Sequence, residues 1–228
     1  MDSLTDAKHL LERASPEVQR AVLAWLRERH PIHQLERQWR VPAEVILEAI
    51  ARSTDLSRRG IRGLIAEAYF DKVVTAGVRG WVNDTPPGNH AFDCLLRHNE
   101  QVVRVQVKSQ RRKQQRPMMA SEGYRRLSAG KLVVETQRTR AGKGVEGADT
   151  RPYRFGEFDV LAVSVEASTN DWTQFRYTVE RWLLPREMDP SLLLKFQPVS
   201  LEPDGDWTDR LSVAIEWFQS DIVKTISS

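Results

Sequence analysis

Apolar residues in the first half of the chain recur at the three- and four-residue spacing of amphipathic helices. Val18, Val22 and Leu26 fall on one face, with Ser-Pro at 15–16 as a start signal and His-Pro at 30–31 as a stop. The pattern predicts helices over Pro16–Arg29, 32–40, Ala43–Arg52 and 64–74, and a last one over 211–222.

A different pattern, in which apolar and polar positions alternate, runs over residues 92–108. Two β-type runs flank an Asn-Glu pair at 99–100, which is typical of a hairpin with a two-residue turn whose Asn tolerates positive φ. In that register position i pairs with 199 − i, so Asp93 lies opposite Gln106. Lys108 emerges on the same face two residues further along. Register alone thus brings three polar side chains together inside apolar strands.

The alternation has a second interpretation. Arg104, Gln106 and Lys108 alternate with three valines, and a strand with one solvated face shows this pattern whatever its function. The alternative to a catalytic group of residues is therefore a wet strand face. Gln110, two residues past Lys108, is open to the same two interpretations, as a phosphate or water ligand or as a solvated side chain.

Further runs of β-branched and aromatic residues predict the rest of a sheet. Strands are expected over 131–139, 158–165 and 175–184, the last of them clearest at Phe175–Val179. The order of helices, hairpin, strands and final helix implies a mixed α/β (α+β) fold, in which helices flank a central mixed sheet. Residues 1–56 then form an N-terminal helical region, and residues 57–228 form the domain that carries the hairpin.

Length and cysteine usage set the outer bounds. The 228 residues contain no apolar run long enough to span a membrane, and the N-terminus lacks the basic and apolar regions of a signal peptide, so a cytoplasmic protein is expected. Cys94 is the single cysteine, which excludes internal disulfides and cysteine-rich zinc sites. Its place in an apolar strand favours a core residue over a nucleophile.

Charge is distributed unevenly along the chain. The net charge is +3, but residues 104–143 hold twelve Lys and Arg against two acids, a local excess of +10. Positive charge directly after the hairpin indicates a polyphosphate partner such as DNA, although a solvated basic loop without a partner is the alternative. The glycine-bearing loop 140–147 is expected to face DNA. The predicted DNA contacts are Arg111, Arg112, Lys113, Arg116, Arg125, Arg126, Arg138, Arg140 and Lys143.

Glu67 lies in the predicted helix over 64–74. We place it between Leu64, Ala68 and Phe70, close to the apolar stripe that faces inward. A carboxylate in that position needs a partner, and a metal-bound water or Lys108 would supply one. The alternative is an ion pair at the edge of the stripe with Arg59, Arg62 or Lys72.

The N-terminal helices allow two interpretations. The helices on either side of residues 39–42 could form a helix-turn-helix that enters the major groove, served by Arg37, Arg40 and Arg52. The turn lacks the expected Gly and the charges of this region balance, which favours a packing or dimerisation layer.

Residues 60–165 resemble the PD-(D/E)XK nuclease superfamily, and within it the type II restriction endonucleases. The resemblance rests on a helix glutamate, a strand aspartate and an acid-X-Lys triplet on the next strand, here Glu67, Asp93, Gln106 and Lys108. It implies catalytic roles for all four residues and binding of Mg²⁺, for which Mn²⁺ should substitute, by Asp93, Gln106 and Glu67. Two departures are evident: Gln106 replaces the acid of the triplet, and Ala91-Phe92 stands where a proline is expected just before Asp93, with Pro86-Pro87 further upstream.

The resemblance implies a sequence-specific endonuclease for double-stranded DNA. Such an enzyme would act as a homodimer, with one site for each strand, and would be accompanied by a cognate DNA methyltransferase. A structure-selective repair or recombination nuclease of the same fold is one alternative. A DNA-binding protein with an inactive site is the other, because Gln106 removes one charge from the metal site.

Overall fold

The computed structural model describes residues 3–138, 151–220 and 222–228. The predicted DNA contacts Arg140 and Lys143, and the glycine-bearing loop over 140–147, lie outside these residues. The chain divides into two compact units, residues 1–58 and 59–228.

Helices make up the N-terminal unit. They are α1 (Ser3–Arg13), α2 (Pro16–Arg29), α3 (Gln34–Trp39), α4 (Ala43–Arg52) and the start of α5 (Asp55–Tyr69). The predictions for α2 and α4 are confirmed in their bounds, α3 is shorter than predicted, and α1 was not predicted. The Ser15 side chain caps α2 by accepting a hydrogen bond from the Val18 backbone, and α3 ends at Arg40 in the left-handed region.

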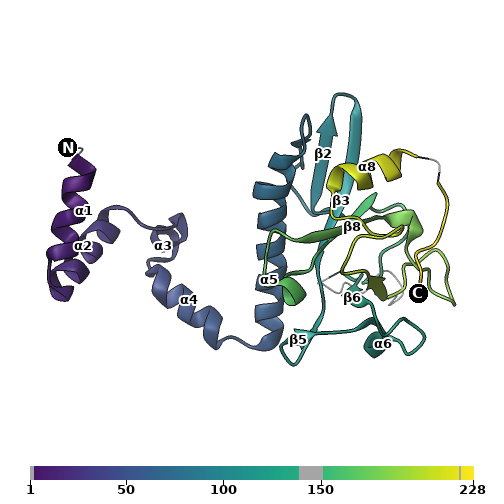
Figure 1. Ribbon diagram of the computed structural model, residues 1–228, viewed down its shortest axis with the longest axis horizontal. Coiled ribbons are helices and arrows are strands. Elements are labelled where there is room, and N and C mark those ends of the chain that lie inside the picture. The colour runs from purple at the N-terminus through teal and green to yellow at the C-terminus, as the bar shows by residue number, and fades with distance from the viewer. Residues whose placement is uncertain (1–2, 139–150, 221) are drawn as a thin grey trace. The chain divides into compact units, whose positions relative to one another are not determined.

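The second unit is built on a mixed sheet of five strands, with helices beside it (Figure 1). Its strands, in spatial order, are β1 (Val82–Asn83), β2 (Cys94–His98), β3 (Gln101–Ser109), β7 (Val160–Ser164) and β8 (Phe175–Val179). Strands β3 and β7 are parallel and the other neighbours are antiparallel. The predicted fold class, a central mixed sheet flanked by helices, is confirmed.

Smaller elements complete this unit. Among the described residues, short antiparallel pairs and short helical segments join the main strands: β4 (Arg112–Lys113) with β5 (Arg116–Pro117), β6 (Leu132–Glu135) with β9 (Phe196–Val199), α6 (Ala120–Gly123), α7 (Glu166–Thr169), the 3-10 turn η3 (Glu180–Trp182) and the π-helical η1 (Phe70–Thr75). The final helix is α8 (Leu211–Gln219). The predicted strands over 131–139, 158–165 and 175–184 are present but shorter.

The hairpin of β2 and β3 has the predicted register. Cys94 pairs with Val105 and His98 with Gln101, and Asn99 in the turn has φ 53°. Asn reaches the left-handed region more easily than most residues, which fits the turn that the sequence predicted. The register matters because it decides which side chains lie opposite Asp93.

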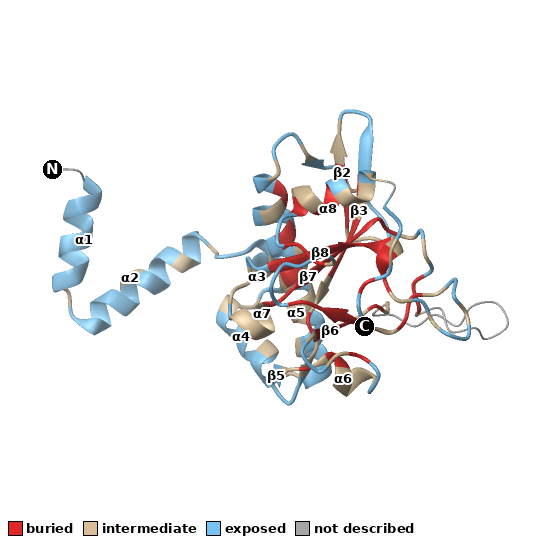
Figure 2. Ribbon diagram, turned by 45° about the vertical axis from the view of Figure 1, so that its right-hand side comes forward, coloured by how far each residue is buried: buried red, intermediate tan, exposed pale blue. Residues whose placement is uncertain are grey.

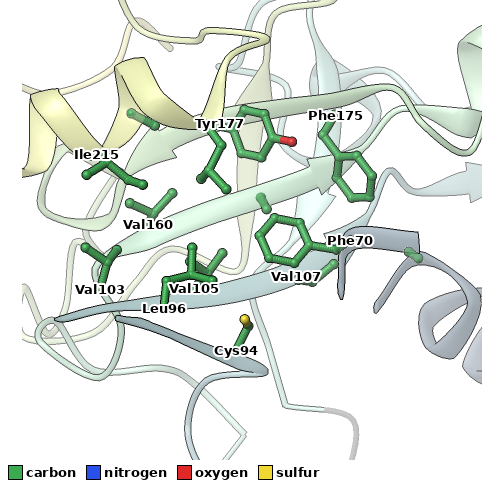
Figure 3. Packing of buried hydrophobic residues seen from close by; sticks show 14 residues of the cluster. Phe70, Cys94, Leu96, Val103, Val105, Val107, Val160, Phe175, Tyr177 and Ile215 are labelled. Carbon is green, nitrogen blue, oxygen red and sulfur yellow. The ribbon is translucent and has the colours of Figure 1, made fainter. Parts of the chain in front are cut away.

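The two faces of the sheet bury different residues. Figure 3 shows Val103, Val105 and Val107 of β3 on the face that packs against Phe70 and α8. Leu161 and Val163 of β7 belong to a second core, formed with segments that cover the opposite face. Because both faces are covered, the alternative interpretation of a wet strand face is wrong for Gln106, which is 1% exposed.

Helix α5 turns a different stripe toward the sheet than the sequence predicted. Leu64 is 63% exposed and Ala68 is also exposed, whereas Ala66 and Phe70 are buried in the core. The small side chain of Ala66 lets the helix approach the strands, and Phe70 fills the space beyond it at the start of η1. Cys94 is 2% exposed in this same core, as predicted.

Candidate active site

Asp93 is held by backbone groups of the neighbouring strand. It lies directly before β2, its N–H donates to the Val105 carbonyl at 3.0 Å, and its Oδ2 accepts from the Val107 N–H at 2.8 Å. Burial raises the pKa of the Asp93 carboxyl, while Lys108 and these hydrogen bonds act in the opposite direction. The carboxylate is therefore both positioned and partly desolvated.

Gln106 lies beside Asp93, where the hairpin register places it. Its Nε2 donates to Asp93 Oδ2, and it also contacts the Val107 carbonyl at 3.3 Å. The amide thus presents nitrogen to the carboxylate. Metal ligation by its oxygen, as the resemblance implies, needs the amide group turned by half a rotation.

Glu67 reaches the same place from α5. Burial, together with the negative charge of Asp93, raises the pKa of Glu67 to about 7, and the Lys108 ammonium opposes the shift. A helix and a hairpin that are separate in sequence thus bring two carboxylates close enough to repel each other. A cation between them would relieve both the repulsion and the desolvation.

Lys108 is half-buried and is confined by an aromatic side chain. Nζ lies 5.4 Å from the centre of the Tyr153 ring, and the Lys108 charge opposes the rise that burial causes in the pKa of the Tyr153 hydroxyl. The Arg138 guanidinium is also 5.4 Å from that ring centre. These contacts hold the flexible lysine side chain near Asp93 and Glu67, where its positive charge lowers the pKa of both carboxyl groups.

Tyr153 was not predicted from the sequence. It follows the segment over 139–150 and reaches the site through an isolated bridge between Gln137 and Pro152 and a hydrogen bond from the Leu193 N–H to its carbonyl at 2.9 Å. Nothing in the local pattern around Tyr153 points to Lys108, because the contact joins residues 45 positions apart. Tertiary folding alone creates this neighbour.

A cavity of about 300 Å³ opens beside the two carboxylates. Glu67 and Asp93 line it, and Asp71, Asn83 and Thr85 form a hydrogen-bonded polar wall. In this wall Asn83 donates to Asp71 at 2.5 Å and accepts from the Thr85 hydroxyl at 2.5 Å. Half of the lining residues are polar, and the cavity is large enough to admit a hydrated ion and part of a phosphate group.

The oxygen donors suit a hard divalent cation. Mg²⁺ is commonly held by one or two carboxylates, with waters and substrate phosphate oxygens completing its octahedron. Glu67 and Asp93 provide two such carboxylates, and burial raises the pKa of both, a cost that a cation bound to their ionised forms would offset. Within the described part of the chain, no three His, Cys, Asp or Glu side chains gather as a metal cluster.

Gln110 is not a solvated side chain. It is 4% exposed, and its Oε1 accepts from the Ser168 hydroxyl at 2.9 Å. Its Nε2 is buried, with no hydrogen-bond partner among the residues that the structure describes. The solvated alternative for this residue is therefore wrong.

The basic segment after β3 is largely paired with acids. Arg112 Nη2 donates to both carboxylate oxygens of Glu166, at 2.7 and 2.6 Å. The other pairs join Arg111 to Glu135, Lys113 and Arg116 to Glu122, Arg126 to Glu187, and Arg138 to Glu157. Because these acids form ion pairs with the basic side chains, the local excess of +10 in the sequence overstates the positive charge available to contact DNA.

Arg125 differs from these residues. It is exposed, and within residues 3–138, 151–220 and 222–228 no carboxylate pairs with it. Among the predicted DNA contacts that the structure describes, it is the side chain best placed to reach a phosphate without breaking an existing pair.

Comparisons with known proteins add one similarity. No family model matches the chain, and neither does any curated protein. Among solved structures, the chain is similar to the bacterial homing endonuclease I-Ssp6803I, at 20% sequence identity over 70% of this chain and 90% of that chain, with a TM-score of 0.39. At that identity and TM-score we infer neither fold nor activity from this similarity.

Proposed function

We propose that this protein is a Mg²⁺-dependent endonuclease that hydrolyses phosphodiester bonds of double-stranded DNA. The observation that carries the proposal is the convergence of Glu67 on α5, Asp93 directly before β2 and Lys108 on β3: the two carboxylates line one cavity, and the Lys108 charge acts on both. The resemblance to PD-(D/E)XK nucleases assigns these same residues to the reaction. In the described part of the chain, no helix has the length and apolar character of a membrane span.

The roles of the residues follow from their positions. Asp93 and Glu67 would hold Mg²⁺, which when bound polarises the scissile phosphate and acidifies a water molecule. Lys108, directed by Tyr153, stabilises the negative charge that builds on the phosphate and orients the attacking water. Gln106 fixes Asp93 through its Nε2 and so keeps one carboxylate oxygen available to the cavity.

The finer proposal is a sequence-specific enzyme of the type II restriction kind. It would cut as a homodimer, with one site for each strand, and a cognate methyltransferase would protect the host DNA. A second candidate is a DNA-binding protein without activity. The contact that favours it is the hydrogen bond from Gln106 Nε2 to Asp93 Oδ2. In this orientation Gln106 presents no oxygen to a metal ion, and one oxygen of Asp93 is already occupied.

Incubation of the purified protein with phage and plasmid DNA, in Mg²⁺ and in EDTA, tests the proposal on a gel. Discrete Mg²⁺-dependent bands are expected. A smear would support a nonspecific or structure-selective nuclease instead, and intact DNA that is still shifted in a binding assay would support the inactive candidate.

Replacement of Tyr153 by phenylalanine is expected to lower kcat about tenfold and leave KM nearly unchanged. The ring stays beside Lys108, and only the hydroxyl, whose pKa the Lys108 charge lowers, is lost; a polar interaction of that kind is worth about 1 kcal/mol or somewhat more. Single-turnover cleavage rates measure the change, and Tyr124→Phe is a matched control in a part of the fold away from Lys108. Equal rates for Tyr153→Phe and the unmodified protein would show that the Tyr153 hydroxyl does not position Lys108.

Arg125 and Arg112 are expected to respond differently to alanine. Arg125→Ala should weaken DNA binding on all sequences. It should also reduce the slope of the logarithm of the DNA-binding constant against the logarithm of the salt concentration by about 1, because one phosphate contact is lost. Arg112→Ala should instead destabilise the fold by about 1–3 kcal/mol, since it leaves the half-buried Glu166 unpaired. Salt-dependent binding and denaturant unfolding measure the two effects. If Arg112→Ala lowers the salt slope at unchanged stability, Arg112 is the phosphate ligand.

A further inference from the structure

A short β-hairpin follows β3, the strand that carries Lys108. Its strands β4 and β5 are antiparallel, and residues 114 and 115 form a two-residue turn between them. We call residues 112–117 the β4–β5 hairpin. Its residues 113–116 are all exposed, and Figure 2 shows β5 near α6 at the edge of the unit. The tip of the hairpin is thus open to a partner molecule.

Both residues of the turn are glutamines in the left-handed region. Gln114 has φ 50° and Gln115 has φ 67°. A two-residue turn with positive φ at both positions is ordinarily made by Asn-Gly, Asp-Gly or Gly-Gly, because most other side chains are strained there. Strained residues of this kind gather at functional sites, where the side chain is needed at that place. Two exposed amides are what this turn has and a glycine turn lacks.

Ion pairs fix the hairpin at two places. At its base Arg112 is bonded to Glu166 of α7. Nearer the tip, Lys113 and Arg116 share the carboxylate of Glu122, at 3.2 and 2.6 Å. The tip is therefore held in a defined position. Because two cations share one acid there, it also keeps a net positive charge, which favours approach to a phosphate backbone.

We propose that the β4–β5 hairpin enters the major groove of DNA, where the amides of Gln114 and Gln115 read A·T base pairs. A two-stranded β-ribbon fits this groove, and a glutamine side chain can bond to N6 and N7 of adenine together. The inference rests on the proposed function, since it names the part of the protein that selects where the DNA is cut.

The length of chain between Lys108 and the turn sets where the reading falls. Gln114 lies six positions after Lys108, and an extended chain spans at most about 3.3–3.6 Å for each residue, so the two residues lie within about 20 Å of each other. Base pairs are spaced by about 3.4 Å, so the A·T pairs lie within about six base pairs of the phosphate that is cut. One chain can therefore contact both places on a single duplex.

Selection of randomised duplexes by binding, in EDTA and in Ca²⁺, tests the proposal without requiring cleavage. The unmodified full-length protein is expected to select one or two A·T pairs, and to bind them about 5- to 150-fold more tightly than duplexes with G·C at those positions. The double variant Gln114→Gly/Gln115→Gly has residues that this turn favours, so it should fold normally. It should bind both kinds of duplex with the affinity that the unmodified protein has for the G·C duplex.

Replacement of adenine by 7-deazaadenine at the selected positions is a sharper probe. It removes the N7 acceptor and keeps the base pair, so it should weaken binding of the unmodified protein about 2- to 10-fold and leave binding of the glycine variant unchanged. If the turn were only structural, both proteins would respond equally. Gln219→Ala, which removes an exposed amide from α8, is the matched control and should retain the full preference.

The outcomes separate this inference from the proposed function. If the glycine variant keeps the unmodified preference, or if the unmodified protein binds all duplexes alike, reading by the hairpin is overturned whether or not DNA is cut. A preference that the glycine variant loses supports the inference, even if Mg²⁺ then produces no cleavage, and in that case only the nuclease function is contradicted. Absence of any DNA binding by the unmodified protein overturns both.

Discussion

Replacement of Lys108 by alanine is expected to lower the rate of DNA cleavage about 10²–10³-fold and to leave DNA affinity within a few-fold of the unmodified protein. The ammonium acts on charge that develops in the transition state, so its loss affects the rate much more than binding. Asp93→Asn should lower the rate at least as much, because it removes a metal-binding charge while retaining an oxygen that can accept from the Val107 N–H.

The control for these variants is Lys224→Ala. Lys224 pairs with Asp206 at 3.0 Å and is not among the predicted DNA contacts, so its loss changes the net charge equally without touching the site. Cleavage rates on a plasmid and binding constants on a short duplex separate the two effects. If Lys108→Ala or Asp93→Asn cuts at the unmodified rate, the site lies elsewhere in the molecule.

Stability in EDTA is expected to fall as pH rises from about 5 to 8. Burial raises the pKa of Glu67 to about 7, above the ordinary value of 4.5, so the folded protein binds this proton more tightly than the unfolded chain. The stabilisation is present below the unfolded pKa and is lost as pH passes through the folded value. Glu180, whose pKa burial also raises to about 7, contributes in the same direction.

Glu67→Gln isolates one contribution. The variant should be more stable than the unmodified protein at pH 8, by about 1–2 kcal/mol, and nearly equal to it at pH 5. Glu180→Gln is the matched control, because it removes a similar pH dependence of stability at a residue that does not line the cavity. Saturating Mg²⁺ should flatten the pH dependence of the unmodified protein and of Glu180→Gln, but much less that of Glu67→Gln.

Urea unfolding at the two pH values, with and without Mg²⁺, measures these differences. The pH dependence that arises from all other titrating groups is the same in the unmodified protein and in Glu67→Gln, so it cancels when their free energies of unfolding are compared. A Mg²⁺ response of Glu67→Gln as large as that of the unmodified protein would show that Glu67 does not hold the cation.

The core of the candidate site could be predicted from the sequence because it depends on local rules. The two-residue turn at Asn99 fixes the hairpin register, and the register sets Asp93 beside Gln106 and places Lys108 two residues beyond. Helices α2 and α4 could be predicted for the same reason, since their apolar spacing, starts and stops lie within a few residues of one another.

Contacts between distant segments decided the rest. The sequence could not show that the face of β3 which bears Gln106 is covered by a second layer, or that Ala66 rather than Leu64 turns inward from α5. Tyr153 reaches Lys108 from 45 positions away, and the acids that pair with the basic segment include Glu157, Glu166 and Glu187 from later in the chain.

The division has a physical cause. Hydrogen-bond register and helix periodicity act over two to four residues, so the sequence by itself determined the hairpin, most of the N-terminal helices and the grouping of Asp93, Gln106 and Lys108. Burial and Coulomb interactions act through space between segments that only the fold brings together. Tertiary structure therefore decided the raised pKa of Glu67, the neutralisation of Arg112 and the exposure of Arg125.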